Sequence, residues 1–149
     1  MTTIELQKEW FTSHVRAVVN EVPGLTAEPD GDGDYPFWGE TCAGWIRPIM
    51  TPPWGVGIMA IAASGVPNKV AVLREINDFN MMDPMVTAFR RADGTIQVFY
   101  RMVAEAVNPE NVTGAMMQVL RAADRIGPML ATVYGGTTPK PMRPAITEG

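Results

Sequence analysis

MVTAFRRADGTIQVFYRMV, residues 85–103, is the stretch that decides the fold of this chain. Every second side chain from Ile96 to Met102 is apolar and lies on one face, which is the period of a β-strand. Asp93-Gly94 separates this run from residues 85–91, and an Asp-Gly pair between two such runs is typical of a β-hairpin turn. The stretch therefore predicts two antiparallel strands, 85–91 and 95–103.

Three amphipathic helices are predicted around this hairpin and towards the N-terminus. Thr2 and Glu5 have the spacing of a capping box before an apolar period of about 3.6 residues. Asn108-Pro109-Glu110 combines a cap residue, a proline at the first helical position and an acid at the positive end of the helix dipole. The predicted helices run from Thr2 to Pro23, from Asn68 or its neighbour to Asp83, and from Asn108 to Gly135.

Between the first two helices, from Leu25 to Pro67, short apolar runs alternate with Gly, Pro and Asp, which predicts strands and tight turns. Connections of this length join antiparallel neighbours, because a parallel crossover needs a dozen or more residues. Residues 30–34, Asp-Gly-Asp-Gly-Asp, are interpreted as the turn after the first strand. The predicted strands are 25–28, 37–49 with breaks near Gly39 and Gly44, and 55–63.

The predicted order is helix, three strands, helix, two strands, helix. This order favours the α+β class, with one antiparallel sheet and helices packed against it in a single domain. We expect the domain to cover residues 1–136. Residues 137–149 contain three prolines and no apolar period, and we expect them to form a disordered Pro-rich tail.

Composition and charge exclude several function classes. The chain has 149 residues and a net charge of −4, with one histidine and one cysteine, which excludes zinc fingers and disulfide frameworks. Arg90, Arg91 and Arg101 form only a small basic cluster, so we expect no nucleic-acid binding. The apolar runs are too short to span a membrane and the N-terminus lacks the features of a signal peptide. We therefore expect a cytoplasmic protein that does not bind membranes.

Asp30, Asp32 and Asp34 have the spacing of the first three ligands of a calcium-binding loop. The position that needs glycine is Tyr35, however, and the position of the bidentate glutamate is Thr41. A solvated acidic turn is the favoured interpretation, and a weak cation site is the alternative. The sequence contains no nucleotide-binding or hydrolase motif. We expect no metal, no cofactor and no catalytic residue.

Cys42 and His14 are the two remaining residues with reactive side chains. Cys42 has no histidine near it in the sequence that would lower its pKa, and we interpret it as structural. His14 flanks the apolar stripe of the first helix, and we interpret it as a partly buried histidine bonded to the backbone.

Tryptophans and methionines are the more informative residues. Methionine packs adaptably against varied partners, and tryptophan is enriched in interface hot spots. Core filling is the favoured role for most of them, and a binding surface is the alternative. The two groups are Trp38, Trp45 and Trp54 in the strand region, and Met81, Met82 and Met85 after the second helix.

Three segments carry a resemblance to a known family. They are LREINDFN (73–80), the Asp93-Gly94 hairpin and AADRIGP (122–128) before Gly135-Gly136. Together with the element order over residues 3–136, they resemble the YbjN-like family, which shares the fold of type III secretion chaperones. Asn77 and Asn80 look like asparagines that recur in this family. We expect their amides to bond the backbone where the helix meets the next strand.

The resemblance implies a non-enzymatic homodimer that binds a protein segment along its sheet or helix faces. Our leading hypothesis is accordingly a chaperone or adaptor. A regulatory or inhibitory protein that occupies one target protein is the alternative. A metal-binding enzyme that uses Asp30, Asp32, Asp34 and His14 is a third hypothesis. The residues expected to contact a partner or a second subunit are Phe79, Met81, Met82, Met85, Trp38 and Trp45.

Overall fold

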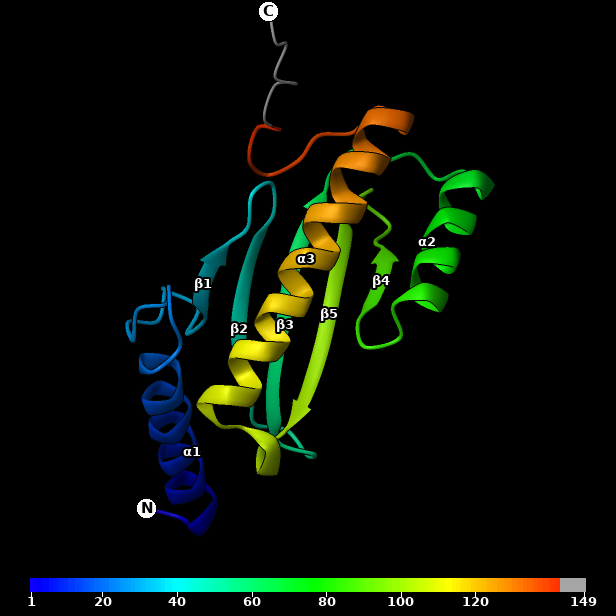
Figure 1. Ribbon diagram of the computed structural model, residues 1–149. Helices are drawn as coiled ribbons and strands as arrows, with labels where there is room; N and C mark the ends of the chain where they lie inside the picture. Colours follow the sequence, from blue (N-terminus) through cyan, green and yellow to red (C-terminus); the bar gives the residue numbers. More distant parts are fainter. Residues whose placement is uncertain (143–149) are drawn as a thin grey trace, which may run out of the picture.

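A computed structural model describes residues 1–142 of the chain and places five strands in one sheet with three α-helices (Figure 1). The order confirms the predicted α+β fold. The helices are α1 (Thr3–Asn20), α2 (Val70–Met82) and α3 (Pro109–Tyr134), with a short 3-10 turn at Ala104–Ala106. The strands are β1 (Tyr35–Trp38), β2 (Ala43–Ile49), β3 (Gly55–Ala63), β4 (Thr87–Arg90) and β5 (Ile96–Val103).

All neighbouring strands of the sheet are antiparallel, in the order β1-β2-β3-β5-β4. The long strands β3 and β5 form its centre and pair from Gly55 with Val103 to Ala63 with Ile96. The predicted hairpin is confirmed, and Gly94 takes the positive φ of 90° that its turn requires. The short strands β1 and β4 lie at the two edges.

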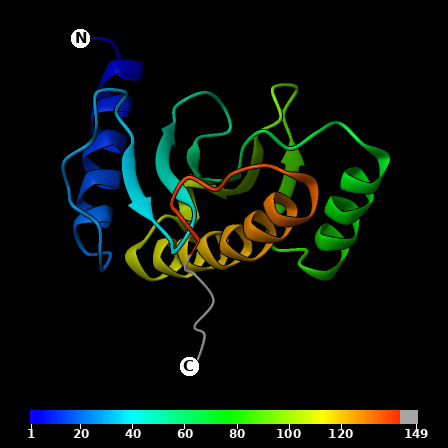
Figure 2. The ribbon, with the colours of Figure 1, turned by 90° about the horizontal axis from the view of Figure 1, so that it is seen from above.

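The helices lie on one side of the sheet and at its two ends. Figure 2 shows α3 along one face, α1 beside β1 and α2 beside β4, with no helix of the described residues across the opposite face. Ile46, Ile58 and Val98 are fully buried in the core on the α3 side. α3 approaches β3 so closely that a Cβ at Gly127 would collide with the carbonyl oxygen of Ala62.

The helix ends confirm two of the three predicted start signals. Thr2 Oγ1 accepts a hydrogen bond from Glu5 N–H and Thr2 N–H donates to Glu5 Oε2, which completes the capping box. Asn108 Oδ1 accepts from Asn111 N–H at 2.8 Å and caps α3. The helix α2 begins after Lys69, which makes no side-chain cap.

One predicted strand is wrong. Residues 25–28 form no strand, and the first strand of the sheet is β1. Leu25 and Ala27 bury only part of their surface, and Pro29, which follows the segment, lacks a backbone donor. β1 instead buries the rings of Tyr35 and Phe37 against the core. The predicted break near Gly39 is confirmed, because it divides 37–49 into β1 and β2, whereas the break predicted near Gly44 is wrong, because Gly44 pairs with Ala60 inside β2.

The first residues of the predicted tail are hydrogen-bonded to the domain. Ser64 and Thr137 exchange two backbone hydrogen bonds of 2.8 and 2.9 Å. Lys140 N–H donates to Thr41 O, and Lys140 Nζ donates to Gly39 O at 2.9 Å. Residues 137–140 thus differ from the loose segment that we expected, because their backbone is hydrogen-bonded to Ser64, directly after β3, and to Thr41 in the β1–β2 turn. The remainder of the predicted tail, 143–149, lies outside the described residues.

Candidate functional site

Two exposed apolar surfaces are candidates for binding a partner. The first, which we call the methionine end, consists of Phe79, Met81, Met82 and Met85 at the junction of α2 and β4. Met81 and Met82 are each 76% exposed and Met85 is 55% exposed. The buried residues of α2 are Val72 and Ile76, and Met81 and Met82 at the end of the helix lie outside the core.

Phe79 connects this surface to the domain, because its half-buried ring packs against the core. A groove between α2 and α3 begins there and carries acidic side chains along its rim. Its lining residues are Glu75, Asp78, Phe79, Met82, Asp83, Arg125, Ile126 and Met129.

Asn80 fixes the position of the methionine end relative to the sheet. Its Nδ2 donates to Ala88 O at 3.0 Å, and its Oδ1 accepts from Ala88 N–H at 2.8 Å. This confirms the role expected for Asn80. Asn77 is exposed, and its side-chain contact is with Met81 Sδ at 3.9 Å, so the same role is wrong for Asn77.

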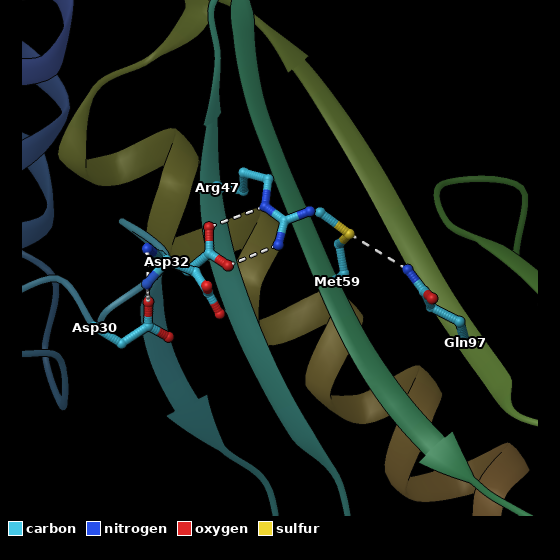
Figure 3. Close-up of polar contacts among 6 residues, drawn as sticks. Asp30, Asp32, Arg47, Met59 and Gln97 are labelled. Carbon is cyan, nitrogen blue, oxygen red and sulfur yellow. Dashed lines mark hydrogen bonds and ion pairs between the residues drawn. The ribbon is translucent and has the colours of Figure 1, made fainter.

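The second surface is the face of the sheet opposite α3, which we call the open sheet face. It consists of Trp38, Trp45, Arg47, Met59, Phe99, Arg101 and their alternate neighbours along the five strands. These positions alternate with the buried residues of the α3 side, so their side chains point away from that helix. Figure 3 views part of this face, with Arg47 on β2, Met59 on β3 and Gln97 on β5.

Most of the tryptophans and methionines singled out in the sequence do not have the core-filling role that we favoured. Core filling is wrong for Trp38, which is 62% exposed, and for the three methionines of the methionine end. Trp54 does pack inside, with its ring centroid 5.7 Å from that of Phe11. Trp45 lies half-buried on the open sheet face, and its buried Nε1 has no acceptor among the described residues.

The acidic turn is closed by an ion pair at the edge of the open sheet face. Arg47 donates two hydrogen bonds to the buried carboxylate of Asp34, at 2.9 and 2.8 Å (Figure 3). The hydrogen bond to Asp34 raises the pKa of the Arg47 guanidinium. Asp30 Oδ1 accepts from the N–H groups of Asp32 and Asp34.

The three aspartates do come together, with one carboxylate oxygen of each within 4.8 Å of the others. Both oxygens of Asp34 are already bonded to Arg47, and Asp30 Oδ1 is bonded within the turn. This geometry favours the acidic turn over the alternative of a cation site. It also makes the turn a fixed part of the β1 edge.

His14 and Cys42 have structural environments. His14 Nε2 lies 3.1 Å from Val107 O and its ring stacks on Trp10, which agrees with the expected backbone contact. Cys42 is fully buried. Burial, together with the negative charge of Asp124, raises the pKa of the Cys42 thiol to about 12. The thiol is therefore protonated at neutral pH and a poor nucleophile.

Sequence reasoning missed most of the open sheet face. It identified Trp38 and Trp45 as contact residues but not Met59 and Phe99, which lie in register with Trp45, or Arg101, which lies in register with Arg47. The signal was present as the second set of alternating positions in each strand.

The fold and these surfaces define a class of small α+β domains with exposed apolar surfaces for protein contacts. A solved structure titled "Crystal Structure of the ExsC-ExsE Complex" has a similar fold, with a TM-score of 0.62 and 17% sequence identity. The similarity covers 80% of this chain and 95% of that chain. The family model TY-Chap1, described as T3SS (YopN, CesT) and YbjN peptide-binding chaperone 1, matches residues 9–142. The chain belongs to this family.

This membership confirms the resemblance to YbjN-like proteins and type III secretion chaperones. It supports a role as a peptide-binding chaperone and points to a protein without enzymatic activity. Comparison with the curated proteins gives no match. Among residues 1–142, no helix is both long and apolar enough to cross a membrane.

Proposed function

We propose that this protein is a non-enzymatic chaperone or adaptor of the cytoplasm that binds a segment of a partner protein. The observation that carries the proposal is the pair of exposed apolar surfaces on a member of a peptide-binding chaperone family. Large exposed side chains grouped on a surface are typical of protein contacts rather than of a monomer without partners. We assign Trp38 and Trp45 to the surface that contacts the partner.

We further propose that the protein acts as a homodimer through the methionine end. Met81, Met82 and Met85 are flexible, polarisable and exposed, which suits a packed interface. The adjacent strand β4 is an edge strand that pairs only with β5 among the described strands. A second copy would cover both features, since an isologous contact buries the same patch on each subunit.

The partner is identified by crosslinking. The tagged chain is expressed in cells of its source, a photo-crosslinking amino acid replaces Trp38, and the joined peptides are sequenced by mass spectrometry. We expect crosslinks that cluster in one segment of one protein. A synthetic peptide of that segment then binds the purified chain in calorimetry.

The same experiment separates the leading function from the regulatory alternative. A chaperone keeps its partner soluble and stable when the two are co-expressed, whereas an inhibitor abolishes the partner's activity without changing its solubility. Absence of any crosslinked protein, together with a purified chain that stays monomeric, would contradict the proposed function. A matched crosslinker at Met117, on α3, shows which crosslinks are nonspecific.

A further inference from the structure

The open sheet face carries an apolar row next to a basic row. Across the sheet, Trp45 pairs with Met59 and Met59 pairs with Phe99, so three large side chains lie side by side. One step along the strands, Arg47 pairs with Gly57 and Gly57 pairs with Arg101. Positions two apart on one strand face are separated by about 7 Å, so the two rows are adjacent.

The charged strand positions of the open sheet face are all basic, and the acidic turn 30–34 lies at its β1 edge, beside Trp45 and Arg47. None of its alternate strand positions in β1 to β5 is Asp or Glu, whereas the net charge of the protein is −4. Arg101 is exposed and donates to the neutral carbonyl of Pro53 at 2.7 Å, so this bond leaves its charge uncompensated. Arg91, just after β4, reaches Gln97 Oε1, again a neutral acceptor. Within the described residues, only Arg47 of these three has a carboxylate partner.

The side chains at the centre of the open sheet face are held in place by their neighbours. Met59 is only 8% exposed and Gln97 only 6%, and Gln97 Nε2 donates to Met59 Sδ at 3.3 Å (Figure 3). Gly57 leaves a shallow position into which Met59 and Phe99 lean. A partner therefore meets a preformed surface, which lowers the entropy cost of binding.

We propose that the open sheet face binds a partner segment in which acidic residues alternate or are closely spaced with apolar ones. This inference rests on the proposed function and states the chemistry of the segment. Apolar side chains of the segment cover Trp45, Met59 and Phe99, and its carboxylates bond the guanidiniums of Arg101 and Arg91. Arginine forms paired, charge-assisted hydrogen bonds to carboxylates, which fixes the register of such a segment.

A protein segment fits this face better than a nucleic acid does. A polyanion that extends across the sheet would meet Asp30 and Asp32, which are exposed at the β1 edge, whereas a protein segment can place its carboxylates at Arg101 and Arg91, on the β5 and β4 side. Two guanidiniums without a carboxylate are few for phosphate contacts, which accumulate in nucleic-acid interfaces. Met59 separates the rings of Trp45 and Phe99 in the apolar row, so successive bases would find no continuous stacking surface.

The test uses three fluorescein-labelled peptides of twelve residues that share the same apolar positions. The positions between them are all Glu in the first peptide, all Lys in the second and all Ser in the third. Binding to the full chain is followed by fluorescence anisotropy at low and high salt, with an oligo-dT of twelve nucleotides beside them. We expect the Glu peptide to bind about ten-fold more tightly than the Lys peptide at low salt, with the preference reduced at high salt.

Arg101→Glu is expected to weaken binding of the Glu peptide about ten-fold and to improve binding of the Lys peptide. Arg121→Glu is the matched control, because Arg121 is exposed on α3 and the charge change is the same. Thermal unfolding establishes that each variant is folded. If Arg101→Glu is unstable, Arg91→Glu takes its place, and Arg101→Lys retains the charge without the paired donors.

Equal binding of the Glu and Lys peptides, or binding of the Glu peptide unchanged by both charge reversals, would overturn the inference and leave the proposed function standing. Failure of all three peptides, or binding of oligo-dT that Arg101→Glu abolishes, would also overturn it. So would a drop in the mass of the protein in Arg101→Glu, which would mean that a second copy covers this face. The proposed function fails separately, when crosslinking recovers no partner.

Discussion

Asp124 is a single residue of α3 that holds the turn between β1 and β2. Its carboxylate accepts hydrogen bonds from the backbone N–H groups of Glu40, Thr41 and Cys42, at 2.9 to 3.1 Å. Burial disfavours the charged form of Asp124, but the bonds from Thr41 and Glu40 outweigh it and hold the pKa of this carboxyl below its usual value. Gly39 lies against the carboxylate, where a Cβ would come within 2.5 Å of Asp124 Oδ2.

Asp124→Asn should lower the free energy of unfolding at neutral pH by about 2 kcal/mol, because hydrogen bonds to a charged acceptor become weaker or are lost. The folded-state pKa is depressed, so the stabilisation is present above the unfolded pKa of about 3.9 and is lost as pH falls through the folded value. Urea unfolding at pH 7 and pH 3 measures this. The difference between the wild type and the variant should be smaller at pH 3 than at pH 7, because the loss begins below the unfolded pKa and continues down to the lowered folded pKa.

Asp78→Asn is the control, because Asp78 is exposed on α2. It should change stability by no more than about 0.5 kcal/mol. A stability difference for Asp124→Asn that is the same at both pH values would contradict the assigned role of its charge.

Asn80, like Asp124, links two elements through hydrogen bonds from its side chain to the backbone, in this case α2 and β4. Asn80→Ala leaves the N–H and C=O of Ala88 without their side-chain partner, and we expect the free energy of unfolding to fall by about 2 kcal/mol. Asn77→Ala, one helical turn earlier, removes only an exposed contact with Met81 and should be nearly neutral. Urea denaturation compares the two variants. Similar losses for both would refute the distinction.

At the scale of elements, α3 packs closely on β3. Gly127 faces the backbone of Ala62, while Gly114 of the same helix has no atom within 4 Å of an added Cβ. The two glycines therefore serve different purposes. Gly127 permits the close approach of helix and sheet, whereas Gly114 only weakens the intrinsic propensity of its helix.

Alanine substitution separates these two roles. Gly127→Ala should destabilise the protein by several kcal/mol or prevent folding, because the methyl group collides with a carbonyl oxygen of β3. Gly114→Ala should instead increase stability by up to about 1 kcal/mol. Circular dichroism during thermal unfolding gives both results. A melting temperature for Gly127→Ala at or above that of Gly114→Ala would contradict the packing described.

Local signals account for the elements that the sequence predicts correctly. Asp93-Gly94 marks the hairpin, and Asn108-Pro109 marks the start of α3, because each acts on residues within a few positions. Leu25–Glu28 was misread as a strand because a short apolar run says nothing about whether a pairing partner exists. The role of Asp124 was not visible either, since its partners lie more than eighty positions earlier in the chain. For the same reason the apolar row of the open sheet face emerged only from the register.

Acidic and basic side chains are unevenly distributed over the whole molecule, and this distribution follows from its topology. Acidic side chains gather in the turn 30–34 at the β1 edge, while the open sheet face carries arginines and aromatic rings. The methionine end lies beside β4, at the opposite end of the sheet from α1. A dimer through the methionine end would thus leave both the open sheet face and α1 uncovered for a partner segment.

Met82→Asp tests the proposed dimer. The substitution places a charge where the interface would remove water, which we expect to shift the protein towards a monomer of about half the mass. Multi-angle light scattering at several concentrations measures the mass, and the melting temperature verifies folding. Leu6→Asp, which changes another exposed apolar side chain, this one on α1, should leave the mass unchanged. An unchanged mass for Met82→Asp, or a reduced one for Leu6→Asp, would refute the interface.

The order β1-β2-β3-β5-β4, described above as a pairing pattern, also governs how the chain is assembled during translation. Strand β3 cannot pair with β5, its second neighbour, until α2, β4 and β5 have left the ribosome. Helix α3, which covers β3 and β5, is made after them. The apolar face of the nascent sheet that α3 covers in the folded protein therefore remains exposed until residues 109–134 emerge. A protein assigned to protect segments of other chains thus depends, while it is being synthesised, on the late arrival of its own last helix.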